Sequence, residues 1–152
     1  MRLWPSPYRI RPDSLPRGWR CALSELPAAV SAVFAVRVLL ALSSLHQVRR
    51  NLLPRHRADR PADLVEIARI AWAVRVASWV VPFASCLTRA QAGQILLARR
   101  GVASTLILGV GSARGDRMAA HAWLVCSGRV VLGAETEAIA AFRPIAELES
   151  VA

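Results

Sequence analysis

The sequence predicts an α+β fold in which N-terminal helices precede a small antiparallel sheet. Long apolar stretches with helical spacing fill the first two thirds of the chain, whereas short runs rich in strand-forming residues begin only after Gly101. At 152 residues the chain is long enough for one domain with an adequate core. We therefore expect an arginine- and proline-rich extended arm over residues 1–25 and a single domain over residues 26–152.

The first helix is expected to begin at Pro27 and to close near Arg49 and Arg50. Its polar face is thin, which predicts burial on most sides. The apolar stretch 26–45 could alternatively face a membrane. Arg37 falls near the centre of that stretch, where a charge costs roughly 2.5–3.5 kcal/mol on insertion. We therefore interpret it as a buried helix.

Two further helices are expected before the sheet. Asp59 or Asp63 can cap the second helix, which Pro82 ends. The third helix begins beside Cys86 and stops at Gly101. Each boundary is marked by a residue type that favours a helix end.

After the helices, residues 104–110 and 120–126 favour two strands. The dipeptide Ser127-Gly128 then predicts a tight hairpin into a third strand over 129–132. The segment 111–117 is expected to be a polar loop. The sheet should therefore be an antiparallel meander.

The composition limits the classes of function. All twenty basic residues are arginine, against ten acids, and the formal net charge of +10 predicts acidic partners. The arginines are spread along the chain with only one tyrosine and three phenylalanines, unlike the clustered basic and aromatic residues of a nucleic-acid interface. We expect no nucleic-acid partner.

The three cysteines are Cys21, Cys86 and Cys126, which are widely spaced and lack a CxxC pair or a histidine at ligand spacing. This pattern disfavours a disulfide framework and a metal site, and it suits a reducing cytoplasm. The first twenty residues carry arginines and prolines without the apolar run of a secretory signal. We expect a cytoplasmic protein without a metal or cofactor.

Cys86 and His121 form the candidate catalytic pair. Unpaired backbone N–H groups and the helix dipole at a helix start stabilise a thiolate, and the same N–H groups can hold an oxyanion. Singly, a free cysteine is more often a buried hydrophobe and a lone histidine more often structural. A thiol at a helix start followed by an imidazole on a strand is nevertheless what general-base activation requires, with a third group to orient the ring.

Glu135 is the predicted orienting acid. Strand pairing about the hairpin turn sets Leu124 opposite Val131 and brings Glu135 next to His121. A charged residue beyond a strand is more often a solvated strand end. Asp116, in the loop before the histidine, is the second candidate.

Five segments carry a resemblance to a known family, namely Cys86–Ala90, Arg99–Val102, Leu106–Val110, Ala120–Val125 and Gly128–Val131. They resemble the protease subunit of lasso-peptide maturation, a family in the transglutaminase-like superfamily of papain-type folds. The motifs cover about residues 85–145, and the chain length is similar to the standalone form of that subunit. The resemblance implies a papain-like cysteine endopeptidase that removes the leader from a ribosomally made precursor, with Cys86 as nucleophile and His121 as base.

The resemblance also implies partners: the leader region of the precursor peptide, a separate leader-binding protein and an ATP-dependent lasso cyclase. We expect only the catalytic unit in this chain, with substrate delivered in trans. The family usually has an aspartate after the histidine strand, and this sequence has none beyond Asp116, so Glu135 would substitute. Two alternatives remain open: acyl transfer to an amine on the same fold, and a non-enzymatic adaptor or membrane-surface protein.

Overall fold

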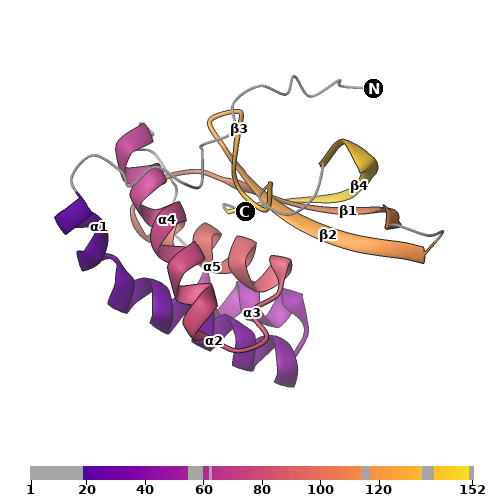
Figure 1. The fold of residues 1–152 in the computed structure, drawn as a ribbon, viewed down its shortest axis with the longest axis horizontal. Coiled ribbons are helices and arrows are strands. Elements are labelled where there is room, and N and C mark those ends of the chain that lie inside the picture. Colours follow the sequence, from indigo (N-terminus) through magenta and orange to yellow (C-terminus); the bar gives the residue numbers. More distant parts are fainter. Residues whose placement is uncertain (1–18, 55–59, 62, 114–116, 135–138, 151–152) are drawn as a thin grey trace.

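The computed structural model describes residues 19–54, 60–61, 63–113, 117–134 and 139–150. Within these ranges the helices precede the strands, as predicted (Figure 1). The elements are α1 (Trp19–Ser24), α2 (Leu26–Leu42), α3 (Leu45–Leu52), α4 (Leu64–Val80), α5 (Cys86–Arg99), β1 (Thr105–Ala113), β2 (Arg117–Cys126), β3 (Arg129–Leu132), a short 3-10 turn (Ile139–Ala141) and β4 (Phe142–Glu149). The predicted α+β class is confirmed.

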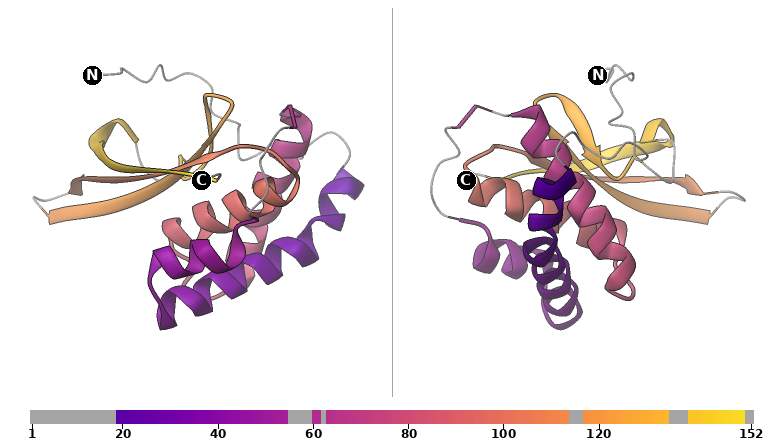
Figure 2. Two further views of the ribbon diagram at one scale, coloured as in Figure 1. Left: turned by 180° about the vertical axis from the view of Figure 1, so that it is seen from behind. Right: turned by 60° about the vertical axis from the view of Figure 1, so that its left-hand side comes forward.

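The strands form one antiparallel sheet in the order β3-β2-β1-β4. The helices gather on one side of this sheet, and α5 lies between it and the remaining helices (Figure 2). A Cβ on Gly93 would meet the side chains of Leu132 and Leu124, so the absent side chain lets α5 approach the sheet closely. The helix that begins at Cys86 is thereby held against the strands.

The expected single helix from Pro27 to Arg50 is two helices. The chain breaks at Ser43 and Ser44, because Ser44 forms a capping box: its Oγ accepts from the Gln47 N–H at 3.4 Å and its own N–H donates to Gln47 Oε1 at 3.3 Å. The prediction of an extended arm over residues 1–25 was wrong at its C-terminal end, since Trp19–Ser24 is helical. Residues 1–18 of the arm lie outside the described residues.

Helix α2 is buried on one face only, unlike the expected burial on most sides. Ala29, Val33 and Val36 are buried, whereas Phe34 and Leu42 are exposed. The stretch Cys21–Leu42 is long and apolar enough to cross a membrane by length and composition, and 22% of it is buried. Core helices of soluble proteins and signal sequences share this length and composition.

Ion pairs of Arg100 join the end of α5 to the starts of α2 and α4. Arg100, directly after α5, pairs with Glu25 at 2.8 Å and with Glu66 at 2.9 Å. Glu25 precedes α2 and Glu66 lies in the first turn of α4, so both helices start where α5 ends. The far ends of α2 and α4 therefore share one end of the helical layer with the start of α5.

The sheet differs from its prediction in length, register and strand number. Strands β1 and β2 extend into the expected loop, to Ala113 and from Arg117. Leu124 pairs with Leu132 rather than with Val131, because a bulge falls between Leu124 and Val125. Strand β4 was not predicted from the sequence. It contains Pro144 and lies at the sheet edge, where proline is tolerated.

Candidate active site

The first turn of α5 positions the candidate nucleophile. Ser85 is the N-cap, and its Oγ accepts a hydrogen bond from the Thr88 N–H at 3.2 Å. Cys86 is therefore the first helical residue, where the backbone N–H groups lack intrahelical acceptors. Its side chain is half-buried, so a substrate can reach the sulfur.

The structure brings Cys86 and His121 together, although 35 positions separate them in the chain. A hydrogen bond from the His121 side chain is the main cause that lowers the pKa of the Cys86 thiol below its ordinary value. Burial raises this pKa, while the backbone N–H groups of Ala122 and Leu87 lower it further. The net direction favours the thiolate, which is the nucleophilic form.

His121 is buried and its ring is held by a backbone carbonyl. Nε2 lies 2.6 Å from the carbonyl oxygen of Gly133. Because a carbonyl oxygen only accepts, the proton in this bond is on Nε2, which leaves the lone pair of the neutral ring on Nδ1. The rings of Phe142 and Trp123 lie with centroids 5.0 and 6.1 Å from the imidazole and restrict its rotation.

Gly133 can supply this carbonyl only because it has no side chain. Its φ is +94°, and a Cβ there would lie 2.7 Å from the Ala122 oxygen and 2.8 Å from the Trp123 Cα. Backbone atoms cannot move away as a flexible side chain can, so any larger residue would displace the carbonyl. Sequence reasoning missed this group. The sequence did contain a signal for it: the hairpin register places Gly133 opposite the strand that carries His121.

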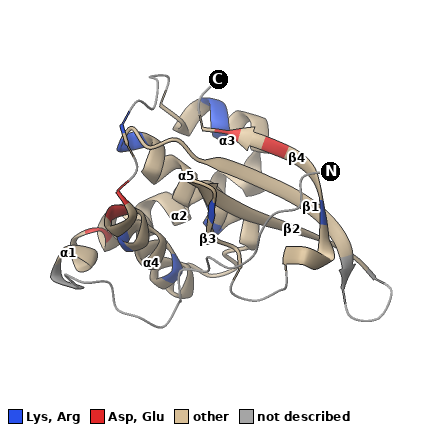
Figure 3. Cartoon of the chain, turned by 90° about the horizontal axis from the view of Figure 1, so that it is seen from above, with Lys and Arg blue, Asp and Glu red and all other residues tan. Residues whose placement is uncertain are grey.

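The predicted orienting acids, Glu135 and Asp116, lie outside the described residues. The acids that the structure does describe are near the starts of α2 and α4, or on β4 (Figure 3). The first group lies at the end of the helical layer opposite Cys86. A carboxylate contribution to the His121 site therefore stays a prediction.

The other two cysteines lie in different surroundings. Cys126 is buried, burial raises the pKa of its thiol, and its Sγ donates to the Ala103 carbonyl at 3.3 Å. Cys21 is exposed on α1. Within the described parts of the chain, His, Cys, Asp and Glu side chains form no group of three that could hold a metal ion. Cys86 is the thiol that the structure pairs with an imidazole.

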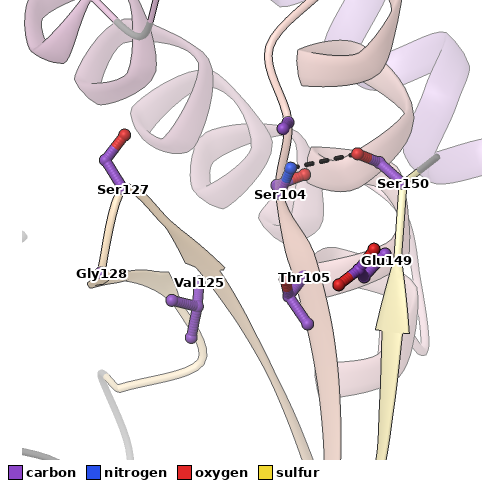
Figure 4. Close-up of a pocket in the computed structure, with 8 residues that line it drawn as sticks. Ser104, Thr105, Val125, Ser127, Gly128, Glu149 and Ser150 are labelled. Atoms are coloured by element: carbon purple, nitrogen blue, oxygen red, sulfur yellow. Dashed lines mark hydrogen bonds between the residues drawn. The ribbon is translucent and has the colours of Figure 1, made fainter. Parts of the chain in front are cut away.

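A separate hollow of about 390 Å³ lies at the C-terminal end of β2, beside Val125 and Ser127 (Figure 4). It is bordered by the hydrogen bond from the Ser104 N–H to Ser150 Oγ, 3.0 Å long. Val125 is four positions along β2 from His121, roughly 13 Å in an extended strand. This hollow is distinct from the candidate pair of Cys86 and His121.

Comparison with known families fits this geometry. The family model described as the transglutaminase-like superfamily matches residues 30–147, which include both Cys86 and His121. The chain belongs to the transglutaminase-like superfamily. This superfamily is related to the papain-like cysteine proteases. No curated protein and no solved structure matches the chain.

A transglutaminase-like site of this form can carry out acyl transfer. The Cys86 thiolate can attack a carbonyl carbon, and N–H groups at the start of α5 that lack an intrahelical acceptor can stabilise the oxyanion that forms. His121 can accept the thiol proton on Nδ1 and later return it to a leaving amine. The Gly133 carbonyl keeps the ring in the tautomer that this proton transfer needs.

Proposed function

We propose that this chain is a cysteine peptidase that removes the leader from a ribosomally synthesised lasso-peptide precursor. The observation that carries the proposal is the hydrogen-bonded pair of the Cys86 thiol and the His121 imidazole at the start of α5. The resemblance of residues 85–145 to the lasso-peptide protease subunit supports the choice of substrate. Membership of the transglutaminase-like superfamily supports the reaction class.

The reaction has two stages. In the first, Cys86 Sγ bonds to the carbonyl carbon of the scissile peptide, and His121 gives its Nδ1 proton to the departing amine of the core peptide. In the second, His121 removes a proton from water and the hydroxide attacks the thioester carbon. The C–S bond then breaks, which releases the leader with a new carboxyl group and restores the Cys86 thiolate. Both stages place negative charge on the same carbonyl oxygen, which the first turn of α5 stabilises.

The proposal includes partners supplied in trans. The precursor would reach Cys86 through its leader region, carried by a separate leader-binding protein, and the released core would pass to an ATP-dependent lasso cyclase. We place these steps in the cytoplasm. The chain has a net charge of +10 and is expected to bind acidic partners. A peptide or protein that carries carboxylates would be such a partner.

Mass spectrometry of precursor incubated with the leader-binding protein and this chain tests the proposal. We expect the wild type to cleave one bond, and Cys86→Ala and His121→Ala to leave the precursor intact. Cys21→Ala removes an exposed thiol that is not paired with His121 and is the matched control, which should cleave normally.

Each alternative function predicts a different result. A product whose mass shows an added amine in place of water would establish acyl transfer instead of hydrolysis. Intact precursor with folded wild-type protein would favour the adaptor or membrane-surface alternative, and Cys86→Ala should then leave peptide maturation unchanged. The exposed face of α2 is the feature that would serve such an adaptor.

A further inference from the structure

Three large apolar side chains are exposed to solvent at the end of α4, just before the nucleophile. Trp79, Val80 and Phe83 are 84%, 69% and 84% exposed; we call them the α4 shelf. The last turn of α4 contains no basic residue. The shelf therefore offers contact to an uncharged, apolar group.

The shelf lies beside Cys86. Phe83 precedes Cys86 by three residues, so their Cα atoms are at most roughly 11 Å apart. Helices α4 and α5 pack as antiparallel neighbours joined by a five-residue connection, 81–85, and packed helix axes are typically about 10 Å apart. A peptide whose carbonyl carbon reaches Cys86 therefore has side chains within reach of the shelf.

The backbone at Phe83 adds a second observation. Its φ is +61°, and it follows Pro82 in a turn. A positive φ favours glycine or asparagine, so an aromatic residue there is strained. Because Phe83 is also exposed, neither its backbone nor its packing in the isolated chain explains an aromatic side chain at this position.

We propose that the α4 shelf is a substrate subsite that takes an apolar side chain, preferably aromatic, of the peptide flanking the bond that Cys86 attacks. The proposal deepens the peptidase function and rests on it. The substrate is the occupant we choose because the shelf is continuous with the connection that leads into the nucleophile. Phe83 and Trp79 would act as specificity residues by covering the bound side chain.

Matched covalent probes measure this preference without the natural precursor. The probes are the peptidyl vinyl sulfones acetyl-Phe-Gly and acetyl-Ser-Gly, to whose alkene the Cys86 thiolate adds while the neighbouring carbon takes the proton from His121. We expect the wild type to react at least about tenfold faster with the phenylalanine probe, a discrimination typical of hydrophobic contact. Labelling of Cys86 by iodoacetamide, which has no side chain to recognise, is the reference rate.

Two variants should remove the discrimination. Phe83→Gly takes away the ring and suits the positive φ, so this protein should fold. Trp79→Ala removes the second ring. Both should react with the two probes at nearly equal rates while iodoacetamide labelling stays unchanged. Phe34→Ala, which removes an exposed ring in the middle of α2, should keep the wild-type discrimination.

The outcomes separate this inference from the proposed function. A thiol at position 86 that iodoacetamide cannot label would overturn the peptidase and the subsite together. Normal iodoacetamide labelling with equal probe rates in the wild type, or with discrimination that survives both shelf variants, overturns the subsite alone. Shelf variants that slow precursor cleavage only when the leader-binding protein is present, with probe discrimination intact, would instead assign the shelf to that protein.

Discussion

The carbonyl oxygen of Gly133 accepts a hydrogen bond from Nε2 of His121 at 2.6 Å. A backbone group thus occupies the position where related triads place an acidic or amide side chain. This bond places the ring proton on Nε2. The Nδ1 atom of His121 can therefore accept the proton of the Cys86 thiol. The geometry of the candidate catalytic pair depends on the backbone path after β3 as much as on side chains.

Gly133→Ala should therefore impair catalysis more than folding. The added Cβ would lie 2.7 Å from the Ala122 oxygen at a φ of +94°, which displaces the carbonyl and releases the ring. We expect kcat/KM for precursor cleavage to fall by about 100-fold or more, in the range lost when a general base is misplaced. Steady-state kinetics with a urea melt would separate the two effects.

Gly128→Ala is the matched control for that variant. Gly128 also has a positive φ, +72°, but a Cβ there would meet nothing within 4 Å. Gly128→Ala should lower the free energy of unfolding by about 1 kcal/mol through backbone strain. Its activity should be retained. Equal kinetic losses in both variants would show that strain in the hairpin, not the His121 bond, limits the reaction.

The lowered pKa of Cys86 predicts the pH dependence of its alkylation. The His121 hydrogen bond stabilises the thiolate, so the rate of iodoacetamide labelling should begin to rise at a lower pH than for an ordinary thiol. His121→Ala removes that bond and should move the rise to higher pH. Burial raises the pKa of Cys126, so Cys126 should be labelled last. Mass mapping of the modified peptides at several pH values gives these rates, and an unmoved profile in His121→Ala would contradict the pairing.

Glu135 remains the predicted acid behind His121. Because the Gly133 carbonyl already holds the tautomer, Glu135→Gln should cost only about tenfold in kcat, far less than the roughly 10,000-fold loss that follows a wrong tautomer. Asp116→Asn should leave kcat unchanged. A loss in Asp116→Asn alone would move the acid role to the loop, and normal rates in both variants would leave the carbonyl as the orienting group.

The Arg100 ion pairs should contribute to stability rather than to catalysis. Arg100→Ala leaves the buried Glu66 with one partner fewer, and we expect about 1–2 kcal/mol of lost stability, a value reduced for the solvent exposure of the arginine. Urea unfolding measures this loss. Arg99→Ala removes a neighbouring exposed arginine and should change the free energy of unfolding by less than about 0.5 kcal/mol.

Local signals in the sequence determined that helices precede strands and that a helix starts at Cys86. Capping residues, proline stops and the Ser127-Gly128 turn act over a few residues, so a short stretch of chain contains the whole signal. The break at Ser44 had such a signal, the capping box with Gln47, although apolar periodicity outweighed it in the prediction. For the edge strand β4, Pro144 argued against a strand, although Ala146-Glu147-Leu148-Glu149 alternates apolar and charged residues as a half-buried strand does.

Only the tertiary structure decided how distant groups meet. The bulge beside Leu124 changes the strand register, Gly133 turns its carbonyl toward His121, and Arg100 joins the end of α5 to the starts of α2 and α4. Each of these depends on packing between segments that are far apart in the chain or on a one-residue shift, and local residue preferences do not specify either. The sequence by itself therefore determined the thiol and the imidazole, whereas the folded backbone decided which group orients the base.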